Sequence, residues 1–502
     1  MQTRLQNFTR QLLTFSLFFV LLSTQALASP SQAGADFEAV DAYLRAEIDE
    51  LRIPGLEMAV VYKDEVLHLG GFGAADAAGS AVTPQTPMVI GSVSKGFTAL
   101  AVMQLAEAGK IDLEAPIQEY LPWFSLSDSK GDIPAGAWKQ IHIRQLLNQT
   151  SGISEYTGAN SWSSREAGDD ALENTVRAFD NFPLVHAPGE AFEYSNANYQ
   201  VLGLIVQAVS GQSYEAYIQE HIFDPLEMHH SYALAGQAPE LASGYRFWFG
   251  QPFPAPGLPY PRAHAPSAML ASCAEDMGHY LIAQMNGGKY GDVRILSEQG
   301  MAELHSPAAD FGNDNRYAMG WVVTPEGALF HNGETPGFTS GIRIDGDWGV
   351  FVVRNIAANQ REQRLDEIAP GAISILQGQP PARNNLDPSF RRTMVILGVL
   401  LGLQLAGLFW AVRRWQRWAR QPGAAPQTTL RTLLAVIPAG AASLALAGLL
   451  WYMGPVSSHR SFSVQALSAP DQMLLLGLNL GLAIAGVAVQ VARALWSLRK
   501  MV

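Results

Sequence analysis

The sequence predicts an α+β domain, with one antiparallel sheet and a separate all-helical lobe, followed by three transmembrane helices. Three observations lead to this prediction. Strand-like segments stand at both ends of the first 376 residues, with a long stretch of helix and loop between them. A Pro- and Asn-rich segment, 377–392, follows as a linker. The remainder, 393–502, contains three uncharged apolar segments of 20 or 21 residues, long enough to cross a bilayer.

The N-terminus predicts a secretory signal peptide over residues 1–28. Two arginines precede an apolar run of 11 residues, and "ALA" at 26–28 supplies small residues before a cleavage site. Because 11 residues are too few to span a bilayer, we expect cleavage before Ser29. An uncleaved membrane anchor is the alternative.

Residues 29–376 are predicted to form the folded domain. Residues 36–52 place apolar side chains on one helical face, and 56–73 have the pattern of a β-hairpin. Strand-like segments return over 327–356. An amphipathic helix, broken at Pro370, then closes the domain.

The charge distribution predicts a membrane protein. The apolar segments lie at 393–412, 433–453 and 473–492. The loop between the first two segments carries five arginines, and the tail that follows the third segment carries three basic residues. By the positive-inside rule, we expect both to be cytoplasmic. The spans hold no ionisable residue, which favours an anchor over a transport path. We therefore expect a bacterial cytoplasmic membrane protein whose folded domain lies on the periplasmic or extracellular side.

The net charges of the two parts argue against nucleic acid as a partner. Residues 391–502 carry +10, whereas 29–390 carry −24, so basic residues are confined to the hydrophobic end. The single Cys273 excludes a disulfide framework within the chain. The adjacent His229 and His230 have no supporting ligands in the sequence pattern, and we expect neither a metal nor a cofactor.

The pattern Ser-x-x-Lys, which in some hydrolases joins a nucleophile to its base, occurs three times. Ser127 lies in a polar loop, and Ser497 at the cytoplasmic end of the third span. Ser92 instead precedes a buried helix, which places Lys95 one turn further on. A helix N-terminus offers N–H groups to an oxyanion, and a desolvated lysine can act as a base. On this motif alone, a helix cap is the better interpretation.

Two further motifs give Ser92 the context of an active site. Tyr194 and Asn196 form the only Tyr-x-Asn in the chain, and His331 and Gly333 form a His-x-Gly after a strand-like run. Taken singly, each of these residues is better interpreted as structural. The other His-x-Gly begins at His68, within the first hairpin, and we also interpret it as structural.

In this order, the three motifs resemble those of the serine β-lactamase and penicillin-binding protein superfamily. The nearest branch contains class C β-lactamases, DD-carboxypeptidases, D-aminopeptidases and esterases. Longer blocks such as "VIGSVSKGFTALAVMQLAEAGKIDLEAPIQEYLP" and "PGEAFEYSNANYQVLGLIV" also resemble it, and together they cover most of residues 36–358. The resemblance implies a β-lactamase/transpeptidase-like fold and a metal-free serine hydrolase that works through an acyl-enzyme.

The resemblance also implies a role for each residue. Ser92 is the expected nucleophile and Lys95 its base or electrostatic partner. Tyr194 is expected to shuttle a proton, with the lysine lowering its pKa. Asn196 is expected to bind the substrate amide. The N–H groups of Ser92 and Glu334 are expected to form the oxyanion hole.

The third motif departs from that of true β-lactamases, which usually have Lys-Thr-Gly. His331 replaces the lysine, and with Gly333 it is expected to contact the substrate. Histidine titrates near neutrality, so it suits a substrate carboxylate less well than lysine does. We therefore expect an amide or ester substrate, with peptidoglycan-type D-amino-acid peptides of the cell wall leading. The alternatives are an esterase of short acyl esters, a weak class C-like β-lactamase, and a non-enzymatic membrane-bound ligand-binding or sensor module.

Overall fold

A computed structural model of the chain places part of its residues. The described residues are 35–129, 132–159, 162, 164–358, 362–383, 389–420, 441–442, 444–446, 448–450, 452, 465–467 and 469–499. The predicted signal peptide, 1–28, lies outside them, and so does most of the predicted second span, 433–453.

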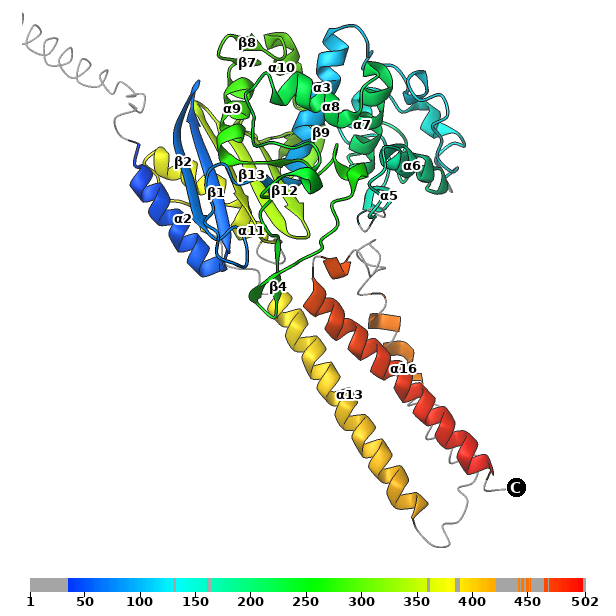
Figure 1. The fold of residues 1–502 in the computed structure, drawn as a ribbon. Helices are drawn as coiled ribbons and strands as arrows, with labels where there is room; N and C mark the ends of the chain where they lie inside the picture. The colour runs from blue at the N-terminus through cyan, green and yellow to red at the C-terminus, as the bar shows by residue number, and fades with distance from the viewer. Residues whose placement is uncertain are drawn as a thin grey trace, which may run out of the picture.

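An antiparallel sheet of eight strands forms the centre of the folded domain, which confirms the predicted α+β class (Figure 1). Its order is β2-β1-β14-β13-β12-β11-β10-β9, so the two ends of the domain sequence meet where β1 pairs with β14. The strands of this sheet are β1 (Gly55–Tyr62), β2 (Glu65–Gly73), β9 (Ala309–Gly312), β10 (Asn315–Tyr317), β11 (Val322–Val323), β12 (Leu329–Thr335), β13 (Phe338–Asp345) and β14 (Trp348–Arg354). Three small pairs complete the strands: β3 (Met88–Val89) with β6 (Ala271–Ser272), β4 (Tyr245–Trp248) with β5 (Gln251–Pro254), and β7 (Lys289–Tyr290) with β8 (Val293–Arg294).

The helices divide into a group that covers the sheet, a separate lobe and a C-terminal pair. Those of the folded domain are α2 (Phe37–Leu51), α3 (Ser94–Glu107), α4 (Ile143–Leu147), α5 (Glu155–Ala159), α6 (Ala171–Arg177), α7 (Asn196–Ser210), α8 (Tyr214–Ile218), α9 (Ala274–Met285), α10 (Glu298–Leu304), α11 (Glu362–Asp366) and α12 (Ile368–Leu376). Helices α4 to α8 form the predicted lobe beside the sheet (Figure 1). The C-terminal pair is α13 (Ser389–Ala419) and α16 (Pro470–Arg499).

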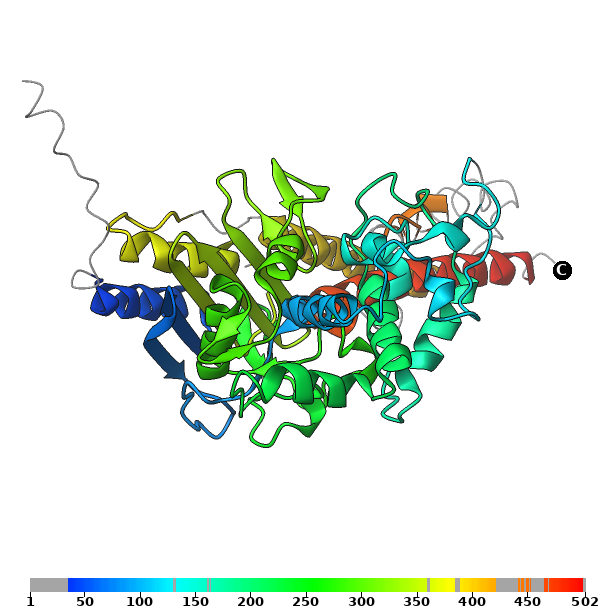
Figure 2. The ribbon, with the colours of Figure 1, turned by 90° about the horizontal axis from the view of Figure 1, so that it is seen from above.

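The two faces of the sheet bury different side chains, because alternate residues of a strand point in opposite directions. On β14, Val350 and Val352 pack with α2 and α12. Phe351 and Val353 belong to the larger core that the sheet shares with α3, α7 and α9. Figure 2 shows α2 (dark blue) and α12 (yellow) together on one side of the sheet, with α3 (light blue) on the other. Helix α3 is therefore enclosed between the sheet and the lobe.

The predicted break of the last helix at Pro370 is wrong in its position. Helix α11 ends at Asp366 and α12 begins at Ile368, so Pro370 lies in the first turn of α12. A proline is tolerated there because the N–H groups of a first turn have no intrahelical acceptor.

Two of the three predicted spans coincide with long helices. The segments Arg391–Arg413 and Pro470–Val489 are long and apolar enough to cross a membrane by length and composition. A hydrogen bond from Gln404 Nε2 to Asn479 Oδ1, 3.0 Å long, joins the two helices.

The two helices contain the patterns Gly398-x-x-x-Gly402 and Gly477-x-x-x-Gly481, a spacing that can bring helices close together in a membrane. A Cβ added at any of these four glycines would lie more than 4 Å from the atoms of other described residues. Close glycine contacts therefore do not hold this pair together.

Candidate active site

Ser92 lies in a tight turn, Gly91–Val93, that leads directly into α3. The side chains of α3 are buried on almost every side from Ser94 to Met103, because the helix runs between the sheet and the lobe. Ser92 itself is half-buried at the surface of a cavity, whereas the Lys95 side chain is completely buried behind it. The turn thus presents the hydroxyl to the cavity and keeps the amine away from water.

Three oxygen atoms surround the Nζ of Lys95. It lies 3.1 Å from Ser92 Oγ, 2.7 Å from Asn196 Oδ1 and 2.7 Å from the carbonyl oxygen of Ser267. An amide oxygen and a carbonyl oxygen can only accept hydrogen bonds. A neutral amine has two N–H groups for these two acceptors, and its lone pair is then left for the hydroxyl of Ser92. An ammonium would instead donate to all three oxygens, so the contacts suit either form of the lysine, and the complete burial of the side chain favours the neutral one.

Burial acts on the protonation of both Lys95 and Tyr194. It lowers the pKa of Lys95 well below its ordinary value, because the charged amine is removed from water. It raises the pKa of Tyr194 well above its ordinary value, and a hydrogen bond with Ser92 offsets only part of this rise. The expectation that the lysine lowers the pKa of the tyrosine is therefore wrong. Burial thus favours a neutral amine at Lys95 and a neutral phenol at Tyr194.

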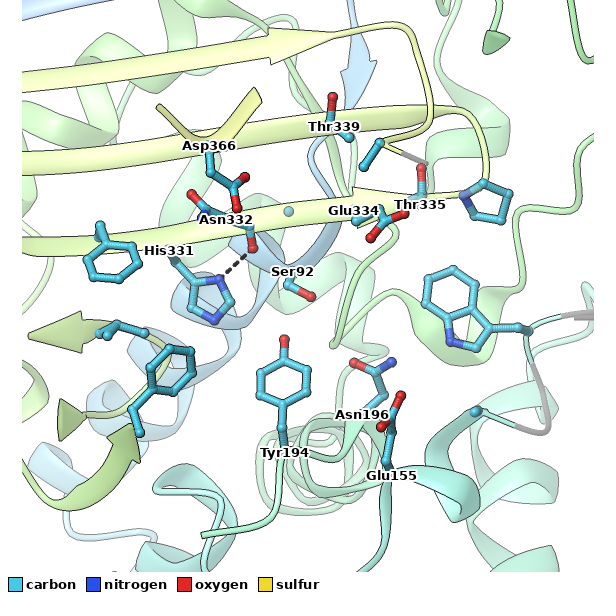
Figure 3. Close-up of a pocket in the computed structure, with 18 of the residues that line it drawn as sticks. Ser92, Glu155, Tyr194, Asn196, His331, Asn332, Glu334, Thr335, Thr339 and Asp366 are labelled. Atoms are coloured by element: carbon cyan, nitrogen blue, oxygen red, sulfur yellow. Dashed lines mark hydrogen bonds between the residues drawn. The ribbon is translucent and has the colours of Figure 1, made fainter. Parts of the chain in front are cut away.

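Tyr194 and Asn196 enter the site from the start of α7. Ser195 is the N-cap residue of that helix and is completely buried, which fixes the chain at this point. The ring of Tyr194 lies beside Lys95, with 4.8 Å from Nζ to the ring centroid. Because the Oδ1 of Asn196 accepts a hydrogen bond from Lys95, its Nδ2 is the atom left to contact a substrate carbonyl. Figure 3 shows Tyr194 pointing at Ser92 across the cavity.

His331 lies on β12, on the opposite wall of the cavity (Figure 3). Its Nδ1 is 2.7 Å from the carbonyl oxygen of Asn332, so Nδ1 carries the proton and donates. Burial lowers the pKa of His331 to about 3. Its Nε2 is buried and has no partner among the described residues. His331 is therefore a neutral acceptor at neutral pH and does not supply the positive charge of the lysine that it replaces.

Gly333 allows β12 to approach the turn that holds the nucleophile. A Cβ at Gly333 would overlap the carbonyl oxygen of Ile90 and the hydroxyl of Ser340. A Cβ at Gly91, where φ is +54°, would lie 2.5 Å from the backbone nitrogen of Glu334. Ser340 Oγ also donates a 2.6 Å hydrogen bond to Ile90. The strand and the turn are thus in direct backbone contact, with the nitrogen of Glu334 beside the residue that precedes Ser92.

The cavity has a volume of about 470 Å³ and holds Ser92, Tyr194, Asn196, His331, Gly333 and Glu334 in its lining. Apolar side chains from several elements complete the wall, among them Trp162 and Phe311. Three carboxylates also line it: Glu155, Glu334 and Asp366. Among the described residues that line the cavity there is no lysine or arginine. The predicted site residues other than Lys95, which is buried behind Ser92, therefore line one cavity, and their roles stay predictions.

Sequence reasoning missed Ser267 and Ser340, which position other groups. Ser267 acts through its backbone carbonyl, and because every residue has one, the sequence carries no signal for it. Ser340 holds the turn of the nucleophile through its hydrogen bond to the carbonyl of Ile90, although it lies 248 positions after Ser92 in the sequence. Its neighbours, Thr339 and Gly341, do not distinguish it from a serine in any other strand.

Neither Ser127 nor Ser497, the serines of the two rejected Ser-x-x-Lys patterns, is among the described residues that line the cavity. Their lysines, Lys130 and Lys500, lie outside the described residues.

A second cluster corrects the statement that His230 has no neighbouring ligands. Its Nδ1, the Sγ of Cys273 and a carboxylate oxygen of Asp276 lie within 4.8 Å of one another. Burial raises the pKa of the Cys273 thiol, which disfavours the thiolate that binds metals. One oxygen of Asp276 already accepts from Ser231 Oγ and from the backbone of His230. These contacts give Asp276 a structural role in holding the segment around His230 and Ser231.

Comparison with known proteins settles the family. The family model described as Beta-lactamase matches residues 40–373. The chain belongs to the beta-lactamase family. It is 29% identical over 401 residues to Protein flp of Staphylococcus aureus (strain MW2), covering 75% of this chain and 74% of that protein. It is 28% identical over 323 residues to the putative penicillin-binding protein PbpX of Bacillus subtilis (strain 168), covering 62% of this chain and 73% of that protein.

Solved structures agree with the beta-lactamase-like fold. The octameric penicillin-binding protein homologue from Pyrococcus abyssi superposes with a TM-score of 0.59 at 24% identity, covering 73% of this chain and 81% of that chain. FmtA from Staphylococcus aureus superposes with a TM-score of 0.55 at 22% identity, covering 70% and 91%. At these identities the likeness shows the fold alone. The family itself supports a function of the serine hydrolase type.

Proposed function

We propose that this member of the beta-lactamase family is a membrane-anchored serine hydrolase that works outside the cytoplasm through an acyl-enzyme. The observation that carries the proposal is the environment of Lys95. The side chain is completely buried, and two of the three oxygens around its Nζ can only accept hydrogen bonds. A buried amine in this setting is a base directed at the Ser92 hydroxyl.

The contacts support the following sequence of steps. Lys95 takes the proton of Ser92 while Oγ attacks the substrate carbonyl carbon. The N–H groups of Ser92 and Glu334 stabilise the oxyanion. The bond to the leaving group then breaks, and Tyr194 passes to that group the proton taken up by Lys95. A water molecule attacks the resulting acyl-enzyme, which restores the hydroxyl of Ser92 and releases the acid.

The leading substrate class is that of peptidoglycan-type D-amino-acid peptides, with esters as the second candidate. Within that class, the cavity favours substrates whose reacting end has no free carboxylate. His331 is neutral, and the described lining contains carboxylates and no lysine or arginine. A carboxylate beside the scissile bond, as in a DD-carboxypeptidase substrate or a β-lactam, would meet no lysine or arginine among the described residues that line this cavity. A D-aminopeptidase-like reaction or the cleavage of an acyl ester avoids this cost.

The membrane anchor is supported by α13 and α16. Both contain apolar segments long enough to cross a bilayer, and the arginines that follow the first lie at its far end from the domain (Figure 1). The orientation with the domain outside the cytoplasm rests on the positive-inside rule and on the predicted signal peptide.

A substrate panel on the full chain in detergent tests the activity. D-aminoacyl amides, peptides ending in D-Ala-D-Ala, short acyl esters and a cephalosporin are each offered to the wild type and to Ser92→Ala. The proposal predicts turnover of amides or esters by the wild type and none by the folded variant. Equal turnover by both contradicts the role of Ser92 as nucleophile. Turnover by neither, although both are folded, contradicts the hydrolase and favours a ligand-binding or sensor module.

A further inference from the structure

The hairpin of β4 and β5 exposes three large aromatic side chains near its tip. The exposed fractions are 41% for Trp248, 51% for Phe249 and 61% for Phe253. The opposite face of β4 buries Tyr245 and Phe247 in the core, so the hairpin is anchored to the folded domain. An aromatic tip of this kind is costly in water, because each ring leaves a large apolar surface unburied.

This hairpin is tied to the start of α16. The backbone N–H of Phe249 donates to Asp471 Oδ2 at 2.9 Å, and Arg246 Nη1 donates to the carbonyl oxygens of Ala466 and Leu467 at 3.3 Å each. Figure 1 shows β4 at the domain ends of α13 and α16. The apolar segment of α16 begins at Pro470. A membrane crossed by α16 therefore has its outer boundary at the hairpin tip.

The same segment of chain reaches the catalytic cavity. Leu467 lines that cavity together with Ser92. Leu467 lies three positions before Pro470 in the sequence, a distance of at most about 10 Å even for an extended chain. The polar layer of a bilayer is about 5–8 Å thick on each side. The wall of the cavity thus stands at the level of the lipid headgroups.

We propose that the tip of the β4–β5 hairpin, Trp248, Phe249 and Phe253, inserts into the interfacial layer of the outer leaflet. The catalytic cavity then takes its substrate from that layer, as an amphiphile whose scissile acyl group lies at headgroup depth. Tryptophan is enriched in this layer because its ring is apolar and its N–H is polar, and phenylalanine contributes apolar contact in interfacial segments. The inference rests on the proposed function, and it adds the source and the amphiphilic class of the substrate. A protein partner is disfavoured because the hairpin is bonded to the span at the membrane boundary.

Depth-dependent quenching tests the insertion in the full chain. Phe253→Cys receives a fluorescent label in vesicles of phosphatidylglycerol and phosphatidylethanolamine that contain spin-labelled lipid. Val293→Cys is the matched control, because it lies on the β7–β8 hairpin at the opposite end of the domain and is 43% exposed. The native Cys273 is buried. The proposal predicts quenching at position 253 and none at 293. Equal quenching at both positions, or none at either, overturns it.

Substrate presentation is tested with the double variant Trp248→Ser/Phe253→Ser. A long-chain acyl ester embedded in the vesicles is compared with a short water-soluble acyl ester. The proposal predicts that kcat/KM for the embedded ester falls about tenfold or more while that for the soluble ester is unchanged. An equal change for both esters overturns it. Labelling of Ser92 by a fluorophosphonate in the same samples separates the two proposals. If the wild type is not labelled, the hydrolase itself is refuted. If it is labelled but shows no preference for the embedded ester, only the membrane-presented substrate is refuted.

Discussion

The Nζ of Lys95 lies 3.1 Å from the Oγ of Ser92, although the lysine is buried and the serine faces the cavity. In the proposed mechanism, this relationship makes reactive a hydroxyl that is a weak nucleophile in water. Burial makes the ammonium form unfavourable, and the neutral amine has its nearest available proton on Ser92. The same burial has a cost in stability, which makes the site testable by more than activity.

Replacing Lys95 by methionine should abolish activity and raise the melting temperature. The pKa of Lys95 is lowered on folding, whereas the unfolded chain has the ordinary value of about 10.4. Between these two values the unfolded state binds more protons, so the free energy of unfolding falls as the pH falls. Lys95→Met removes this destabilising effect of protonation, because methionine does not bind a proton. Thermal unfolding at pH 7 and pH 9 checks it, with Lys289→Met at an exposed position as the control. A melting temperature below that of the wild type contradicts the account.

Replacing Asn196 by aspartate should move the pH profile of kcat/KM to higher pH. The Oδ1 of Asn196 lies 2.7 Å from Lys95 Nζ, and a carboxylate there favours the ammonium form. Activity that needs the neutral amine rises as the pH rises through the pKa of Lys95. The ascending limb in Asn196→Asp is therefore expected to shift upward by about one unit or more. Asn181→Asp, at an exposed position, should leave the limb in place; an unshifted limb in Asn196→Asp would count against Lys95 as the base.

Replacing Gly333 by alanine should slow acylation even where the protein folds. The added Cβ would meet the carbonyl of Ile90 and the hydroxyl of Ser340, so β12 must move away from the nucleophile's turn. A misplaced oxyanion donor costs about 10²–10³ in kcat. Gly168→Ala is the matched control, because a Cβ there meets no other described residue. Burst kinetics with an activated ester measures the effect, and a wild-type acylation rate in Gly333→Ala is the result that would refute the contact.

Acid should destabilise the protein through buried histidines, which include His305, whose pKa burial lowers to about 4, as well as His264 and His331. Burial lowers the pKa of His264 and of His331 to about 3, against about 6.5 in the unfolded chain. Between pH 6.5 and pH 3 unfolding takes up protons, so each of these two histidines lowers the free energy of unfolding by about 1.4 kcal/mol per pH unit as the pH falls. Urea unfolding at pH 7 and pH 5 measures the loss. His331→Gln should reduce it, and His229→Gln, at an exposed position, should not.

The local patterns predict much of this fold. The hairpin at the start of the domain and the return of strands at its end follow from period-two alternation, and α3 follows from its apolar run. The pairing of β1 with β14 joins residues that lie nearly 300 positions apart in the sequence. The alternation of apolar residues within each strand carries no information about which strand will be its partner. The position of Pro370 in a first helical turn also depends on where α11 ends, which a broken apolar pattern leaves open by a few residues.

The candidate site divides in the same way. Side chains with distinctive chemistry, such as Ser92, Lys95 and Tyr194, can be found from motif order. Their protonation cannot, because it depends on burial, and the pKa of Tyr194 is raised where the motif alone predicts that it is lowered. The backbone carbonyl of Ser267 and the reach of Leu467 into the cavity from the membrane end have no sequence signature at all.

The most direct test of the central claim is the rate at which a fluorophosphonate labels Ser92 as a function of pH. Full-length protein in detergent is treated between pH 5 and pH 9, and the labelled peptide is identified by mass spectrometry. The account predicts an adduct on Ser92 alone, a rate that rises with pH to a plateau, and no adduct in folded Lys95→Met. Labelling of Lys95→Met at the wild-type rate, or an adduct at another serine, would contradict it.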